Sequence, residues 1–181
     1  MMMKKIYLIG ILILLSSCVT SKITSNKLSG FDEKISKLFI TVKGSDSSKS
    51  FFQSFVVSLR KKLKKKNVEL RSHYYSPLSL ETENDVEIKI SDFGPNLIMS
   101  INQTESIQTI NNSGFGNNTF GWGFNNGYNT GGTFDVKIFQ PNSKKPVWRA
   151  NLKANGQMGL GESAEKAVKK LIEKLIEDNL L

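Results

Sequence analysis

Apolar residues in this chain alternate with polar ones in several short stretches and recur at helical spacing in two longer ones. Residues 35–42 and 68–71 have the alternation and β-branched content of strands. Between them, apolar positions three or four apart predict an amphipathic helix from about 48 to 66, buried on a sheet. Asn67 suits its end, because Asn tolerates the left-handed conformation. The buried face comprises Phe52, Phe55, Val56, Leu59 and Leu63.

The second half of the chain has the clearest strand patterns. Residues 97–104 begin with an apolar pair, as in a central strand covered on both faces, and the pattern continues toward 110. Residues 133–139 and 146–154 alternate on either side of a turn with Pro and Asn, which predicts an antiparallel hairpin with Trp148 in the core. A final amphipathic helix follows 159–161. Its apolar face comprises Ala164, Ala167, Val168, Leu171 and Leu175.

Residues 81–92 fit two patterns. Val86, Ile88 and Ile90 alternate as in a strand, whereas Val86 and Ile90 also lie on one face of a helix. Asn84 is a candidate N-cap, and a Gly-Pro pair would end a helix after 93. We favour a short helix.

These elements predict one fold class. It is an α/β (α+β) two-layer sandwich, with two helices packed on one face of a mixed four- to five-stranded sheet. The expected order is β-α-β-(α)-β-β-β-α, in a single domain from 31 to 181. Gly and Asn dominate residues 111–132, which we expect to be a long mobile hairpin loop. Either this loop is merely disordered, or Phe120, Trp122 and Phe124 contact a membrane or a partner.

The N-terminus has the pattern of a secretory signal. Lys4 and Lys5 precede an apolar run over 6–15, too short to span a bilayer, and small residues lead to Cys18. Residues 15–18 resemble the bacterial lipobox. That resemblance implies a signal peptide at 1–17 and a lipidated (palmitate-type) Cys18, followed by a flexible tether over 18–30. The alternative is an ordinary cleaved signal with a buried free thiol.

Basic residues outnumber acidic ones, 25 Lys and Arg against 16 Asp and Glu, for a net charge of +9. Removing the two signal lysines leaves +7, which favours membrane phosphates or anionic glycolipid as partners over nucleic acid. The positive charge is densest at the end of the first helix. That run is either a solvated helix end or an anionic-lipid contact, and comprises Arg60, Lys61, Lys62, Lys64, Lys65 and Lys66.

Candidate catalytic chemistry is sparse. His73 is the single histidine, and once Cys18 is lipidated no thiol remains to accompany it in a zinc site. We expect a surface or edge-strand imidazole. The sequence has no nucleophile-elbow motif and no phosphate loop, so we expect neither an enzyme nor a cofactor. Two classes remain open: a binding or accessory module of an outer-membrane complex or anionic glycolipid, and a structural lipoprotein with no small ligand.

The chain resembles small outer-membrane lipoproteins of Bacteroidota type. The likeness lies in the lipobox at Cys18, in 93–98 (FGPNLI) and in 146–150 (PVWRA) before the last helix. Its layout also resembles the lipopolysaccharide-assembly lipoprotein family, although the long aromatic loop departs from that family. With Val19 after the cysteine, the resemblance implies an outer-membrane lipoprotein whose domain faces the periplasm.

Overall fold

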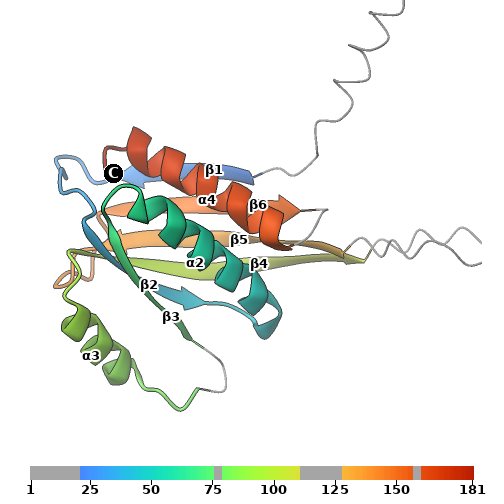
Figure 1. The fold of residues 1–181 in the computed structure, drawn as a ribbon, viewed down its shortest axis with the longest axis horizontal. Helices are drawn as coiled ribbons and strands as arrows, with labels where there is room; N and C mark the ends of the chain where they lie inside the picture. Colours follow the sequence, from blue (N-terminus) through green and yellow to red (C-terminus); the bar gives the residue numbers. More distant parts are fainter. Residues whose placement is uncertain (1–20, 76–78, 111–127, 157–159) are drawn as a thin grey trace, which may run out of the picture.

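The computed structural model describes residues 21–75, 79–110, 128–156 and 160–181, which form a mixed sheet and its helices (Figure 1). The six-stranded sheet has the order β1-β6-β5-β4-β2-β3. Strand β2 is parallel to β3 and β4, and the other neighbours are antiparallel. The strands are β1 (Ser21–Lys27), β2 (Lys37–Lys43), β3 (Glu69–Tyr75), β4 (Leu97–Ile110), β5 (Tyr128–Phe139) and β6 (Trp148–Gly156). The helices are η1 (Asp46–Ser48), α2 (Lys49–Lys64), α3 (Glu83–Phe93) and α4 (Leu160–Glu177).

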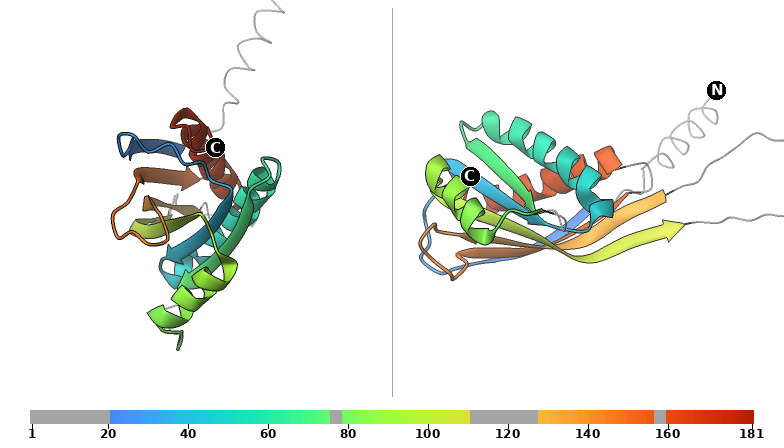
Figure 2. Two further views of the ribbon diagram at one scale, coloured as in Figure 1. Left: turned by 90° about the vertical axis from the view of Figure 1, so that its left-hand side faces the viewer. Right: turned by 90° about the horizontal axis from the view of Figure 1, so that it is seen from below.

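Helices α2 and α4 lie side by side on one face of the sheet (Figure 2). Their apolar faces meet alternate residues of the strands, because side chains along a strand point to opposite faces. The predicted helical faces are confirmed: Phe55, Leu59 and Leu171 are buried in this core. Asn67 has a φ of 58° just beyond α2, in the left-handed conformation expected for the end of that helix.

The third helix, α3, packs on the opposite face of the sheet, over β2 and β3. Phe39 and Phe93 form a small second core there with Val86. Lys37 Nζ and the Arg71 guanidinium lie 4.6 and 4.9 Å from the centre of the Phe93 ring. The β2–β3 end of the sheet is therefore covered on both faces, while β4, β5, β6 and β1 are covered on one.

The helical interpretation of 81–92 is confirmed, but Asn84 is not its cap. Thr82 is the N-cap: its hydroxyl accepts a bond from the Asp85 amide, and the Asp85 carboxylate accepts from the Thr82 amide at 2.8 Å. This reciprocal capping box satisfies two amides that a helix start leaves free. Gly94, with a φ of 59°, ends the helix, as the Gly-Pro pair predicts.

The predicted architecture needs two corrections. The sheet has six strands, not four or five, and a third helix covers its other face. The predicted tether over 18–30 is wrong for Ser21–Lys27, because these residues form β1. Their alternation is weak, with Ile23 alone packed on the core, and pairing with β6 stabilises them as a strand. The order is therefore β-β-α-β-α-β-β-β-α.

The hairpin before the long loop extends further than its sequence predicts. Strands β4 and β5 stay paired to Ile110 and Tyr128, so residues 128–132 belong to β5 and not to the predicted 111–132 loop. The remaining segment, 111–127, lies outside the described residues. So do the candidate contact residues Phe120, Trp122 and Phe124.

Candidate functional site

The strand register gives the sheet two distinct ends. At the end we call the Ser21 end, Ser21 pairs with Ala154, and at the Lys27 end, Lys27 pairs with Trp148. Strands β4 and β5 extend farthest toward the Ser21 end (Figure 1). Cys18, the predicted lipidation site, lies outside the described residues, but it comes only three positions before Ser21. Three residues of extended chain span at most about 11 Å.

Asp178, just beyond α4, ties β1 to the rest of the domain. Its Oδ2 accepts hydrogen bonds from the Ser25 hydroxyl at 2.5 Å and from Trp148 Nε1 at 2.7 Å. Lys174 Nζ lies 3.4 Å from the other oxygen. Burial by itself raises the pKa of Asp178, but the Ser25 and Trp148 bonds and the Lys174 charge bring it below its ordinary value. The first strand is thus held by the ladder to β6 and by an ionised carboxylate.

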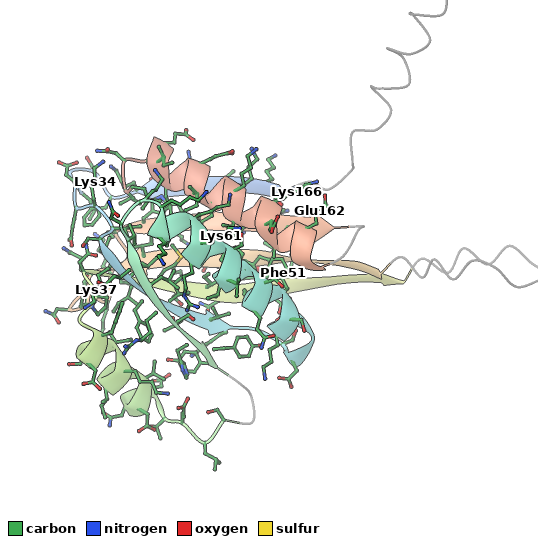
Figure 3. All side chains as sticks on the ribbon, in the orientation of Figure 1. Lys34, Lys37, Phe51, Lys61, Glu162 and Lys166 are labelled. Atoms are coloured by element: carbon green, nitrogen blue, oxygen red, sulfur yellow. The ribbon has the colours of Figure 1, made fainter. Side chains whose placement is uncertain are left out.

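The basic run of α2 lies at the Lys27 end, away from Ser21. The chain leaving α2 is bonded to the start of β2, where the Glu69 amide donates to the Ser36 carbonyl at 3.0 Å. In Figure 3, Lys61 lies toward this end of the helix and Phe51 toward the other. The pKa of Glu173 on α4 is lowered mainly by its hydrogen bond from Lys170, and the charge of Lys62 adds to this effect. The other members are exposed, namely Arg60, Lys61, Lys64, Lys65 and Lys66.

The uncovered face of β4, β5, β6 and β1 is polar from strand to strand. Asp135 lies near its middle, where its two oxygens accept from Arg149 Nε at 2.7 Å and Nη2 at 3.2 Å. Lys137 Nζ lies 3.0 Å from the same carboxylate. Burial opposes ionisation, but these cations bring the pKa of Asp135 below its ordinary value. A shallow hollow of about 360 Å³ lies beside this cluster, lined by Thr24, Ser25, Asn26, Thr104, Asp135, Arg149, Ala150 and Asn151.

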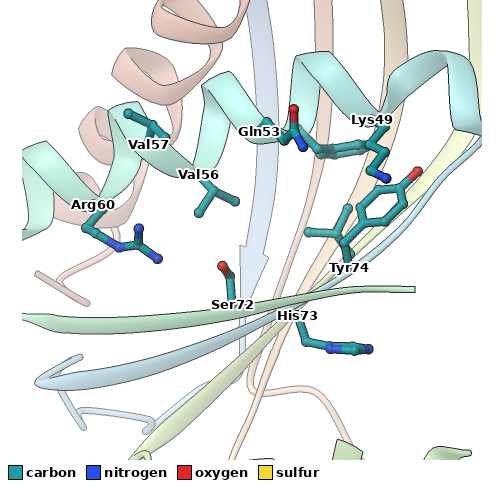
Figure 4. A pocket seen from close by; sticks show the side chains of 10 residues that line it. Lys49, Gln53, Val56, Val57, Arg60, Ser72, His73 and Tyr74 are labelled. Atoms are coloured by element: carbon teal, nitrogen blue, oxygen red, sulfur yellow. The ribbon is translucent and has the colours of Figure 1, made fainter. Parts of the chain in front are cut away.

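A second hollow, of about 220 Å³, runs between α2 and the edge strand β3 (Figure 4). Val56 and Val57 form its wall on α2, and Ser72 and Tyr74 reach toward it from β3. Val57 is 64% exposed, although it belongs to an otherwise amphipathic helix. The hollow combines an apolar wall with cations, because Lys49 and Arg60 also line it.

His73 lies on β3 and points away from that hollow (Figure 4). Its edge-strand position is as predicted, but its side chain is only 11% exposed. Burial and the charge of Lys89 lower the pKa of His73, against the opposing effect of Glu81. The Glu81 carboxylate is 3.4 Å from Nε2 and is also bonded to Lys89. Among the residues that the structure describes, no cluster of His, Cys, Asp and Glu fits a metal ion.

The structure brings together residues that sequence reasoning did not connect. Asp178, just beyond α4, meets Ser25 of β1 and Trp148 of β6. Lys22 of β1 pairs with Lys153 of β6, far away in the sequence. Of these residues, only Trp148 could be predicted from the sequence: the alternation of apolar and polar residues over 146–154 predicts the buried position that it occupies. None of the described helices is long and apolar enough to cross a membrane.

The fold defines a class of small α/β domain with two helices on one sheet face. No family model and no curated protein matches the sequence. Among solved structures, the PelC dodecamer of Paraburkholderia phytofirmans has a TM-score of 0.54 at 11% identity, over 84% of this chain and 96% of PelC. Another crystal form of PelC gives 0.53. The lipoprotein GNA1162 of Neisseria meningitidis reaches only 0.42, at 9% identity, over 78% of this chain and 99% of that chain. The chain therefore has a fold similar to that of the PelC subunit.

Proposed function

We propose that this chain is a lipid-anchored outer-membrane protein that acts by binding a partner and not by catalysis. The observation that carries the proposal is the short connection from Cys18 to β1. Only two residues separate the lipobox cysteine from Ser21, the first residue of a strand that β6 and Asp178 hold in the sheet. A lipid on Cys18 would therefore orient the domain instead of leaving it on a loose tether.

That orientation directs the Ser21 end of the sheet toward the bilayer and the Lys27 end away from it. Helix α2 is about 24 Å long at 1.5 Å per residue, and its basic run lies at the far end. Charges are screened over about 8 Å at physiological ionic strength. The basic run of α2 is thus too distant to contact the headgroups of the anchoring leaflet. The geometry favours an acidic partner on the periplasmic side, such as a protein of an outer-membrane complex.

The anchor is tested by the Cys18→Ala variant. We expect this variant to leave the outer-membrane fraction or to accumulate unprocessed, because it lacks the thiol that would carry the proposed lipid. A variant that still fractionates with the outer membrane overturns the anchor assignment.

The partner surface is tested by crosslinking in the native envelope, followed by identification of the captured proteins. Reversing charge at Lys61, Lys64 and Lys65 should abolish the specific crosslinks. The matched control reverses Lys144 and Lys145, exposed lysines of the β5–β6 turn, and should leave them intact. Equal loss in both variants would show that net charge, and not the α2 surface, drives capture.

The alternative is a structural lipoprotein that assembles with copies of itself. Two observations support it: PelC, of similar fold, is a dodecamer in its solved structure, and β1 and β3 are edge strands of this sheet. Edge strands carry unpaired amides and carbonyls that can pair with another chain. Native mass spectrometry of the lipidated protein in detergent separates the two, since self-assembly requires a defined oligomer without any added partner.

A further inference from the structure

Two lysines face each other at the Ser21 end of the uncovered sheet face. Lys22 of β1 is the register partner of Lys153 of β6, and both side chains are exposed. Both alternate with core-facing residues, Ile23 on β1 and Leu152 on β6, so both leave the sheet on the side opposite the core. Because β1 is an edge strand, Lys22 also lines a hollow of about 310 Å³ together with residues of α4, namely Lys170, Glu173, Lys174 and Glu177. Directly opposite residues of an antiparallel pair have Cβ atoms about 4.5–5.5 Å apart, and like charges at this distance repel.

No salt bridge in the described residues joins either lysine to an acidic residue. Every Asp and Glu of the sequence lies in the described ranges, and none forms a salt bridge with Lys22 or Lys153. Glu105 lies in the same cross-strand row, but it is two strands away from Lys153. Its carboxylate accepts a hydrogen bond from the Thr133 hydroxyl at 2.9 Å. Asp135, in the next row, is held by Arg149 and Lys137.

The acidic residues on the other side of β1 are also neutralised. Glu173 of α4 is paired with Lys170 at 3.0 Å, and Glu177 with Lys174 at 3.0 Å. Neither lysine of the Lys22–Lys153 pair therefore forms a salt bridge within the chain. An anion from outside the chain would complement the two adjacent positive charges.

We propose that the Lys22–Lys153 pair binds the phosphate groups of anionic phospholipid headgroups in the leaflet that holds the Cys18 lipid. This inference rests on the proposed anchor. Lys22 is four residues after Cys18, so about 14 Å of extended chain is the greatest separation between the lipidated residue and this strand. The pair and the acyl chains thus engage one membrane, and the two contacts fix the tilt of the sheet.

The test is amine-reactive footprinting of the full lipidated protein, reconstituted in vesicles and read by mass spectrometry. One vesicle type contains phosphatidylcholine and phosphatidylglycerol, and the other contains phosphatidylcholine alone, so that no lipid amine competes for the reagent. A lysine near an anionic surface gains about 1 kcal/mol, or roughly fivefold. We expect labelling of Lys22 and Lys153 to fall about fivefold in the anionic vesicles, and the difference to vanish in high salt. Lys64 and Lys65, at the far end of α2, are internal controls that should label equally in both.

A variant shows whether the two lysines act together. Lys153→Gln should reduce the protection of Lys22, whereas the matched Lys64→Gln should leave it unchanged. Equal labelling of Lys22 in both vesicle types overturns the inference, as does protection of Lys64 and Lys65 in its place. Protection that survives high salt would overturn the electrostatic contact by indicating steric burial. Failure of the protein to float with either vesicle type, checked before labelling, would instead overturn the anchor itself.

Discussion

Removing the Asp178 carboxylate should destabilise the domain, because β1 loses a contact and the buried indole N–H of Trp148 loses its acceptor. Trp148 is 1% exposed, so in Asp178→Ala its Nε1–H loses a charged acceptor and gains no water. A hydrogen bond to a charged group contributes about 1.5–3 kcal/mol. The Ser25 hydroxyl is partly exposed and can turn to solvent, so its lost bond adds only about a few tenths of a kcal/mol to the destabilisation. We expect a loss of about 2–4 kcal/mol in the free energy of unfolding.

Two matched variants separate this mechanism from a general effect of α4. Asp178→Asn keeps an acceptor oxygen but no charge, so it should cost about 1–2 kcal/mol. Glu177→Ala removes the neighbouring carboxylate, which is 70% exposed, and should change stability by less than about 0.5 kcal/mol. Urea unfolding of the mature chain, followed by circular dichroism, measures all three. An Asp178→Ala midpoint equal to that of Glu177→Ala would refute the reasoning.

The same carboxylate makes stability depend on pH. Because the pKa of Asp178 is lower in the folded protein than in the unfolded chain, the folded state binds fewer protons in acid. Its contribution is complete above the unfolded pKa of about 3.9 and is lost as pH falls through the folded value. The stability difference between the native protein and Asp178→Asn should therefore narrow below about pH 4. A difference that stays constant from neutral pH to pH 2 would contradict this assignment.

Three further predictions concern packing, the long loop and a helix cap. Leu59→Ala should cost about 2–5 kcal/mol by urea unfolding, since the side chain is fully buried, whereas exposed Val57→Ala should be near neutral. Replacing 111–127 with Asn-Gly should leave the melting temperature within a few degrees, because the flanking strands remain paired and that turn suits a hairpin. Thr82→Ala should cost about 0.5–2 kcal/mol and speed amide exchange in α3, while a variant with unchanged exchange would show that the cap is dispensable.

The sequence predicts the helices and strands whose apolar residues recur periodically. It does not predict β1, whose pairing partner is far away in the chain. The apolar stripes of α2 and α4 predict their buried faces residue by residue, because a helix repeats its contacts every three or four positions. Strand β1 has the sequence SKITSNK, with one apolar residue. Its conformation depends on β6 and on Asp178, which is 153 residues from Ser25. No local pattern contains that information.

The candidate contact residues can be predicted from sequence only where they are neighbours in the chain. The basic run of α2 is contiguous and therefore visible in the sequence, but its distance from Ser21 depends on the strand order. Lys22 and Lys153 are each unremarkable in sequence, and only the β1–β6 register makes them a pair. The predictions for Cys18 and for the aromatic residues of 111–127 stay predictions.

The position of β1 at the sheet edge also has a consequence for biogenesis. Under the proposed export the chain would be delivered from its N-terminus, so β1 would arrive long before β6, its neighbour in the described sheet. Until β6 follows, residues 21–27 cannot be held by that ladder, nor by Asp178 beyond α4. Strand β1 can therefore form only after nearly the whole chain has crossed, and the proposed acylation of Cys18 has that interval in which to occur.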